Sequence, residues 1–129
     1  MNCFEKQTIM SMHRLITEQT GGNPALRDEG LLESALAASF ATFGGEELYP
    51  SDEEKCVRLA YALVKNHPFA DGNKRIGMLA LLVSLSLIGS AFHPTNEEVA
   101  RVGIAVASGE MDAAALLAWV RGENDADAP

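Results

Sequence analysis

The chain of 129 residues is 47% hydrophobic, so it can bury one core of ordinary size and has no room for a second domain. Its 18 acidic and 10 basic residues give a net charge of −8, which argues against direct nucleic-acid binding, because proteins that bind nucleic acid normally present a basic face. The longest apolar run, residues 76–88, is too short to span a bilayer, so we expect no membrane insertion.

The start of the chain and the cysteines predict where the protein works. The first residues lack the basic segment and apolar run of a signal peptide, which favours a cytoplasmic protein. Cys3 and Cys56 show no metal-ligand spacing and are too few for a disulfide scaffold, so we expect reduced thiols. We therefore expect a single domain over residues 1–122, followed by a disordered acidic tail at residues 123–129.

Hydrophobic spacing predicts a first helix over residues 8–20 that ends at Gly21 and Gly22. The apolar stripe of this helix comprises Ile9, Met12, Leu15 and Ile16. His13 lies within the stripe, so we expect a hydrogen-bonded core residue rather than a ligand. A second helix begins after Asp28, its predicted N-cap, and should finish near residues 44–45. Its apolar positions are Leu31, Leu32, Ala35, Leu36 and Phe40.

Residues 43–50 differ in character, because two glycines, two acids and a Leu-Tyr-Pro run predict an extended loop or small hairpin. Four more helices follow. Capping boxes at residues 51–54 and 95–98 open two of them, and Asp112 caps the last, which Gly122 closes. The helix over residues 76–89 is apolar nearly all round, which predicts a central helix buried on every side. The fold class is therefore all-α, with about six helices.

The stretch between the third and fourth predicted helices carries most of the residues capable of chemistry. Pro68 disfavours the helical region for His67, so the preceding helix should end at about Asn66. Asn73, which follows Gly72, is the predicted N-cap of the next helix. The first N–H groups of that helix would form a natural anion site.

The side chains of this stretch favour phosphoryl or nucleotidyl transfer. Lys74 and Arg75 face the positive end of the helix dipole, which costs roughly 0.3–1 kcal/mol each unless an anion is bound there. His67 is suited to accept a proton at neutral pH, and Asp71 offers an oxygen ligand to Mg²⁺. Taken singly, each residue is better explained by a turn, a cap or a solvated surface; the misplaced cations and the tight spacing together indicate a functional site.

Residues 67–75 read His-Pro-Phe-Ala-Asp-Gly-Asn-Lys-Arg, and this stretch closely resembles the signature of the Fic/Doc family, especially its Doc branch of death-on-curing toxins. Weaker similarity extends over residues 5–121 and includes the Arg27-Asp28 pair. The resemblance implies the Fic fold, in which helices surround a central buried helix. It also implies that residues 43–50 form a flap beside the active site that holds the target; a plain connecting loop is an equal alternative.

The resemblance further implies a role for each matching residue. His67 would be the general base, and Asp71 would hold Mg²⁺ against the phosphates of ATP. The anion hole and the phosphate contacts would come from Gly72, Asn73, Lys74 and Arg75. The function implied is that of a toxin kept in check by an antitoxin protein. Such a toxin would phosphorylate a threonine of a translation factor such as elongation factor Tu and arrest translation.

Three alternatives remain open. The first is AMP transfer to a protein hydroxyl. Fic enzymes that transfer AMP carry a glycine where this chain has Lys74, but Gly72 resembles those enzymes more than the alanine of some Doc proteins does, so the choice between the two reactions stays open. A catalytically idle domain that binds a nucleotide or a partner is a second alternative. The third, a metal-dependent hydrolase with His67 and Asp71 as ligands on one helical face, is disfavoured because Pro68 breaks that face.

Overall fold

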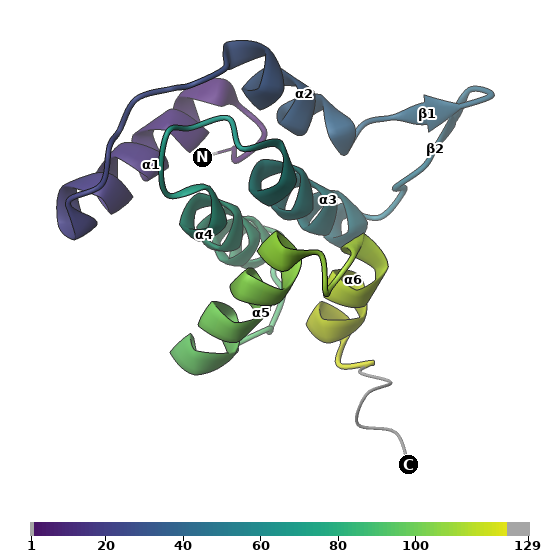
Figure 1. The fold of residues 1–129 in the computed structure, drawn as a ribbon. Coiled ribbons are helices and arrows are strands. Elements are labelled where there is room, and N and C mark those ends of the chain that lie inside the picture. Colours follow the sequence, from purple (N-terminus) through teal and green to yellow (C-terminus); the bar gives the residue numbers. More distant parts are fainter. Residues whose placement is uncertain (1, 124–129) are drawn as a thin grey trace.

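The computed structural model describes residues 2–123, and the remainder of the predicted acidic tail, residues 124–129, lies outside them. The described chain is all-α apart from one small hairpin (Figure 1). The elements are α1 (Lys6–Thr20), α2 (Glu29–Ala38), β1 (Thr42–Phe43), β2 (Glu46–Glu47), α3 (Asp52–Asn66), α4 (Asn73–Leu87), α5 (Asn96–Ser108) and α6 (Ala113–Arg121). Within this range, none of the helices is both long and apolar enough to cross a bilayer.

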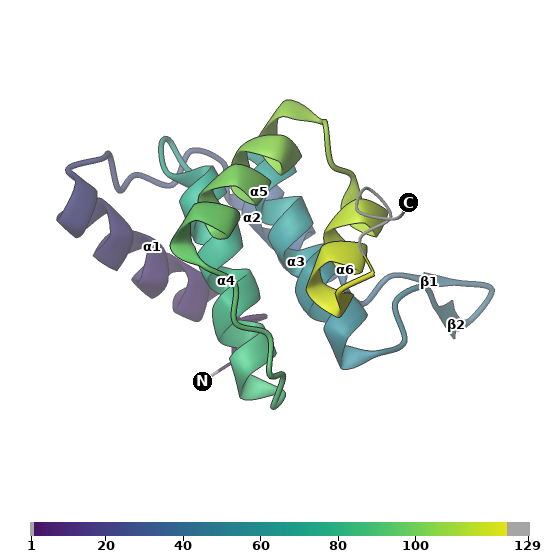
Figure 2. The same cartoon turned by 90° about the horizontal axis from the view of Figure 1, so that it is seen from below.

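The helices α3 and α4 form the centre of the molecule. They pack most extensively against each other; α1 and α5 flank α4, while α2 and α6 cover α3 (Figures 1 and 2). Gly77 of α4 allows α3 and α4 to approach each other closely. A Cβ atom at this position would lie 2.4 Å from Val64 Cγ2 and 3.0 Å from the carbonyl oxygen of Ala60. The loop between α3 and α4 therefore connects the two helices that pack most extensively in the fold.

We expect Gly77→Ala to destabilise the protein by about 1–3 kcal/mol, because the added methyl group forces α3 and α4 apart. The midpoint of urea unfolding, followed by circular dichroism, measures this effect. Gly30→Ala is the matched control, since Gly30 is exposed in the first turn of α2 and should stay within about 1 kcal/mol of the wild type. Equal stability of the Gly77 variant and the wild type would contradict the packing described for this helix pair.

The prediction that the fourth helix is buried on every side is wrong in part. Its middle is buried, and it begins at Asn73 and ends at Leu87. However, Leu87 and Ile88 are 54% and 44% exposed. Leu79 and Leu82 are only partly buried, and they line an apolar groove between α4 and α5. The reason is that α1 and α5 flank α4 without meeting over its outer face or its last turn.

The second helix is shorter than predicted. It ends at Ala38, well before residues 44–45, and Phe40 is 50% exposed rather than part of the core. Buried Ser39 explains the early end, because its hydroxyl donates to the carbonyl oxygen of Lys55 on α3 at 2.7 Å. This bond ties the chain to α3 and directs it into the hairpin.

The predicted small hairpin is confirmed. The two-residue strands β1 and β2 pair antiparallel, and the turn residues Gly44 and Gly45 both have positive φ, of 61° and 84°. Such a turn favours glycine at both positions. Four of the five predicted N-caps are confirmed as well: both capping boxes are formed, and the carboxylates of Asp28 and Asp112 accept backbone N–H groups of their helices.

The two cysteines are buried and free, as expected. Burial raises the pKa of the Cys3 and Cys56 thiols above their usual value. Since the thiolate is the reactive form of cysteine, both residues act as small apolar side chains of the core.

Candidate functional site

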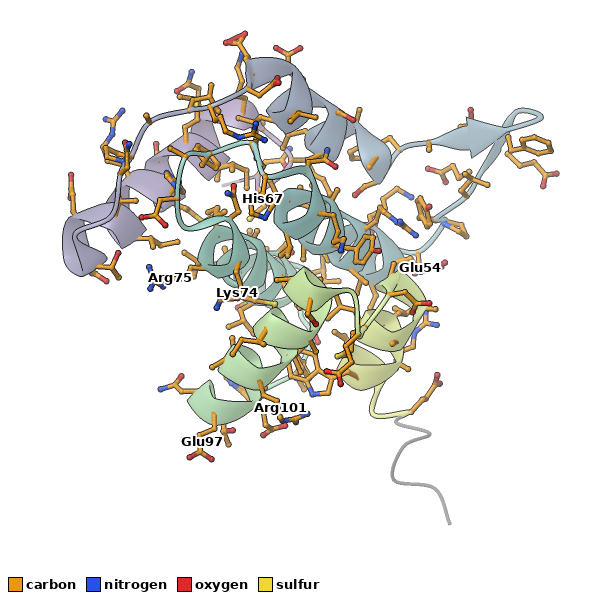
Figure 3. The ribbon with its side chains drawn as sticks, viewed as in Figure 1. Glu54, His67, Lys74, Arg75, Glu97 and Arg101 are labelled. Atoms are coloured by element: carbon orange, nitrogen blue, oxygen red, sulfur yellow. The ribbon has the colours of Figure 1, made fainter. Side chains whose placement is uncertain are left out.

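His67 lies where α3 gives way to the loop that leads to α4 (Figure 3). The helix ends at Asn66 as predicted, and the Asn66 amide donates to the carbonyl oxygen of Leu31 on α2 at 3.1 Å. His67 itself has φ 52° and ψ 54°, and it is the one non-glycine residue with positive φ in residues 2–123. This left-handed conformation turns the chain out of the helix and leaves the residue exposed.

Asn73 does not cap the fourth helix, and the prediction that it does is wrong. The cap residue is Gly72, with φ 75°, and Asn73 is the first residue of α4, only 5% exposed. Its amide turns back into the loop. There Oδ1 accepts the N–H of Phe69 and Nδ2 donates to the carbonyl oxygen of Phe69, both at 2.9 Å. The cause is that Phe69 is buried, so its backbone groups need partners inside the protein.

The Asn73 amide also orients the imidazole of His67. Because Oδ1 is fixed by a backbone donor, Nδ2 is the atom that faces His67 Nδ1, at 3.3 Å. An amide N–H donates, so Nδ1 accepts, and a neutral His67 ring in this arrangement carries its proton on Nε2. Asn73 therefore affects the site in two ways: its side chain orients the ring of His67, and its own backbone N–H faces the cavity.

His13 supports the loop from beneath, and the prediction that it is a hydrogen-bonded core residue is confirmed. It is 1% exposed, and its Nε2 donates to the carbonyl oxygen of Asp71 at 2.6 Å. Its ring stacks on that of Phe69, with 3.7 Å between centroids and 10° between planes. A Cβ atom at Gly72 would come within 3.4 Å of His13 Nε2. The stacked, buried rings of His13 and Phe69 thus fix the position of the backbone at residues 71 and 72.

The carboxylate of Asp71 lies at the rim of the site, on an exposed residue. Its Oδ1 accepts the N–H of Gly72 at 2.9 Å, and its Oδ2 faces the N–H of Asn23 at 3.4 Å. Gly22 leaves room for it, because a Cβ atom there would stand 2.8 Å from Oδ2. Residues 2–123 contain no cluster of three potential metal ligands. A single carboxylate fits Mg²⁺ that takes its other ligands from nucleotide phosphates and water.

The start of α4 combines cations with free backbone donors. Within the described chain, no acceptor is found for the N–H groups of Asn73, Lys74 and Arg75, and the first helical bond runs from Ile76 to Gly72. Lys74 and Arg75 are exposed, and no carboxylate of residues 2–123 lies within salt-bridge distance of either. This end of α4 therefore has an uncompensated positive charge, as an anion site requires.

All six predicted site residues line one cavity of about 300 Å³ between the end of α3, the loop and the start of α4. They are His67, Asp71, Gly72, Asn73, Lys74 and Arg75. Ala107 of α5 forms part of the opposite wall. The apolar groove between α4 and α5, of about 380 Å³, adjoins this cavity, because Lys74 and Arg75 border both. Gly103 of α5 makes room for the Lys74 stem, since a Cβ there would meet Lys74 Cγ at 3.1 Å.

The hairpin does not lie beside this cavity, so of the two alternatives for residues 43–50 its position favours a connecting segment over a flap at the site. Lys55 ties it to the first turn of α3, through an ion pair with Glu47 at 3.0 Å and a hydrogen bond to the carbonyl oxygen of Tyr49. His67 stands at the other end of α3, roughly 20 Å away along a helix of this length. Figures 1 and 2 both show the hairpin projecting away from the loop between α3 and α4.

Comparison with known proteins identifies the family. A model of the Fic/DOC family matches residues 3–85, more than half of the chain, so this chain belongs to the Fic/DOC family. The match includes α1 to α3, the loop and most of α4. The chain is also similar to Toxin Doc of Mycolicibacterium smegmatis (strain ATCC 700084 / mc(2)155), with 39% identity over 69 residues. That alignment covers 54% of this chain and 53% of the relative, so the chain matches about half the length of that protein.

Proposed function

We propose that this chain is the toxin of a toxin–antitoxin pair and acts as a protein kinase that uses ATP and Mg²⁺. Its target would be a hydroxyl, such as a threonine of elongation factor Tu, and translation would stop as a result. The observation that carries the proposal is the uncompensated pair Lys74 and Arg75, which faces the same cavity as His67 and Asp71. Family membership and the similarity to a Doc toxin support it.

In the proposed reaction, the free N–H groups at the start of α4 and the two cations bind phosphate oxygens of ATP. Asp71 would hold Mg²⁺, which neutralises phosphate charge when bound. His67 takes the proton of the target hydroxyl as its oxygen bonds to the γ-phosphorus. The bond between the γ-phosphorus and the bridging oxygen breaks, ADP leaves, and His67 returns the proton to solvent.

The hydrogen bond between Asn73 and His67 places a requirement on the proton transfer to His67. With the resting proton on Nε2, the free lone pair of His67 points at the Asn73 amide. The ring must therefore exchange its proton between the two nitrogens before Nε2 can accept a proton from the target, since a turn of the ring alone would present Nδ1 instead. Hydrogen bonds of catalytic groups often reach their working geometry only when substrates bind.

Phosphate transfer is favoured over AMP transfer because of Lys74. Its ammonium group adds a second cation to the first turn of α4, where a long side chain can hold a phosphate group that a glycine cannot. The nucleotide would then enter with its γ-phosphate towards His67. AMP transfer is the second candidate, and Gly72, which resembles the Fic enzymes more than the Doc branch, is the feature that favours it.

The mass of purified elongation factor Tu after incubation with the protein, ATP and Mg²⁺ tests the proposal. We expect a gain of one phosphate per molecule and the release of ADP. A gain of AMP with release of pyrophosphate would support the second candidate. ATP binding without any modification, either of this factor or of proteins in a cell extract, would indicate a domain that only binds.

We expect a separate antitoxin protein to close the site. The chain lacks the Ser/Thr-x-x-x-Glu-Gly/Asn segment by which some Fic proteins block themselves, since Ala25 precedes Glu29-Gly30 and Trp119 precedes Glu123-Asn124. The apolar cavity between α4 and α5 is a suitable place, because a partner helix lying there would reach Lys74 and Arg75 at its end.

Expression of this chain alone should arrest bacterial growth, and co-expression of its antitoxin, encoded by a neighbouring gene, should restore it. The growth rate after induction is the measurement. His67→Ala is the control, and at equal soluble expression it should be harmless. Normal growth with abundant, folded wild-type protein would contradict the assignment as a toxin.

A further inference from the structure

The connector between α1 and α2 crosses the loop that carries the candidate site. The N–H groups of Arg27 and Asp28 both donate to the carbonyl oxygen of Pro68, at 2.8 and 2.9 Å. The N–H of Ala70 donates in turn to the carbonyl oxygen of Ala25 at 2.9 Å, and Leu26 pairs with Phe69 in an antiparallel bridge. A segment some forty residues away in sequence therefore holds the backbone on the C-terminal side of His67.

The side chain of Arg27 holds the backbone of His67 itself. Its Nε donates to the carbonyl oxygen of His67 at 2.9 Å, and its Nη2 donates to the same oxygen at 2.5 Å. Nη2 also lies 3.4 Å from the carbonyl oxygen of Asn66. These carbonyl groups stand at the C-terminal end of α3, where the helix has unpaired acceptors and the negative end of its dipole. A guanidinium group satisfies both.

His67 needs such a contact because its backbone is strained. A non-glycine residue with φ 52° and ψ 54° persists only where the surroundings impose that conformation. Asn73 restrains the ring at 3.3 Å, but it does not hold the peptide that follows. The two donors of Arg27 on one carbonyl oxygen restrain that peptide, and with it the direction in which the imidazole leaves the chain.

We propose that Arg27 is a positioning residue for His67. It lies outside the cavity lining, so it acts through the histidine and not on a substrate. The inference rests on the proposed function for its catalytic consequence, while its structural part concerns the ring of His67 alone. Loss of the guanidinium group lets the left-handed backbone relax, and the imidazole then points away from its working direction.

Arg27→Ala tests this proposal, with Arg101→Ala as a matched control that removes a cation from the exposed face of α5 (Figure 3). The first readout is the ¹⁵N spectrum of the histidine rings, in which His67 is assigned by its disappearance in His67→Ala. We expect the His67 ring signals to move in Arg27→Ala and to stay in place in Arg101→Ala. The second readout is steady-state kinetics, in which kcat should fall by a factor of about 10–100 while KM for ATP changes little.

Arg27→Gln is the second variant, because its neutral amide can reach one carbonyl oxygen but cannot place two N–H groups on it. We expect an intermediate loss of kcat, and this variant decides the question if Arg27→Ala does not fold. A folded Arg27 variant with wild-type His67 signals would overturn the proposal, as would displaced signals with unchanged kcat. If the wild type transfers nothing to any protein, the proposed function fails, and the ring signals still decide whether Arg27 positions His67.

Discussion

His67→Ala should abolish target modification and leave the fold intact. Loss of a positioned general base lowers a rate by about 10²–10⁴. His67 is exposed, and its truncation removes a side-chain hydrogen bond with Asn73 at the edge of the site, so the urea unfolding midpoint should change little. Initial rates of phosphate incorporation, together with unfolding curves, measure both quantities.

Two further variants sharpen this test. His67→Asn keeps a residue type that tolerates the left-handed region and should be equally inactive. His93→Ala, an exposed histidine outside the site cavity, should keep full activity. Wild-type turnover in a folded His67→Ala protein would remove His67 from the mechanism.

Lys74→Gly should lose kinase activity, because the phosphate group held by the ammonium is no longer bound. The variant can also gain weak AMP transfer, since it then has the glycine found in Fic enzymes that transfer AMP. The products from ATP, separated by chromatography, measure both activities. Glycine weakens a helix by about 1 kcal/mol relative to alanine, so Lys74→Ala is needed to separate the charge from the backbone.

The sign of the stability change distinguishes a binding role from a structural one. Lys74 faces the positive end of the α4 dipole, so Lys74→Ala should stabilise the free protein by roughly 0.3–1 kcal/mol while it lowers activity. A destabilised Lys74→Ala protein would mean that the lysine serves the fold. Retained kinase activity in this variant would show that its ammonium group is not needed for phosphate transfer.

Local rules predicted most of the fold. The capping boxes at residues 51–54 and 95–98 and the left-handed glycines that end α1 and α6 depend on neighbours in sequence, and all are present. The two ends of α2 differ in how well the sequence predicts them. Its start follows from Asp28, but its finish depends on the bond between Ser39 and Lys55, which lies on another helix.

The composition of the candidate site was also predictable, because its residues are consecutive. Its supports were not. His13 is 58 residues from Asp71, and Arg27 is 40 residues from His67. Asn73 was misread for another reason: its type suits a cap, but the burial of nearby Phe69, which local sequence does not reveal, draws its amide into the loop. The place of the hairpin at the far end of α3 follows from chain order, since β2 directly precedes α3, and the ion pair between Lys55 and Glu47 holds it there.

The fate of labelled ATP tests the proposed kinase activity most directly. Wild-type protein, Mg²⁺ and elongation factor Tu are incubated in parallel with ATP labelled at the γ-phosphate and with ATP labelled at the α-phosphate. We expect only the γ-label to reach the target, and we expect Lys74→Ala and His67→Ala to abolish its transfer. Transfer of the α-label by the wild-type protein would contradict the kinase assignment.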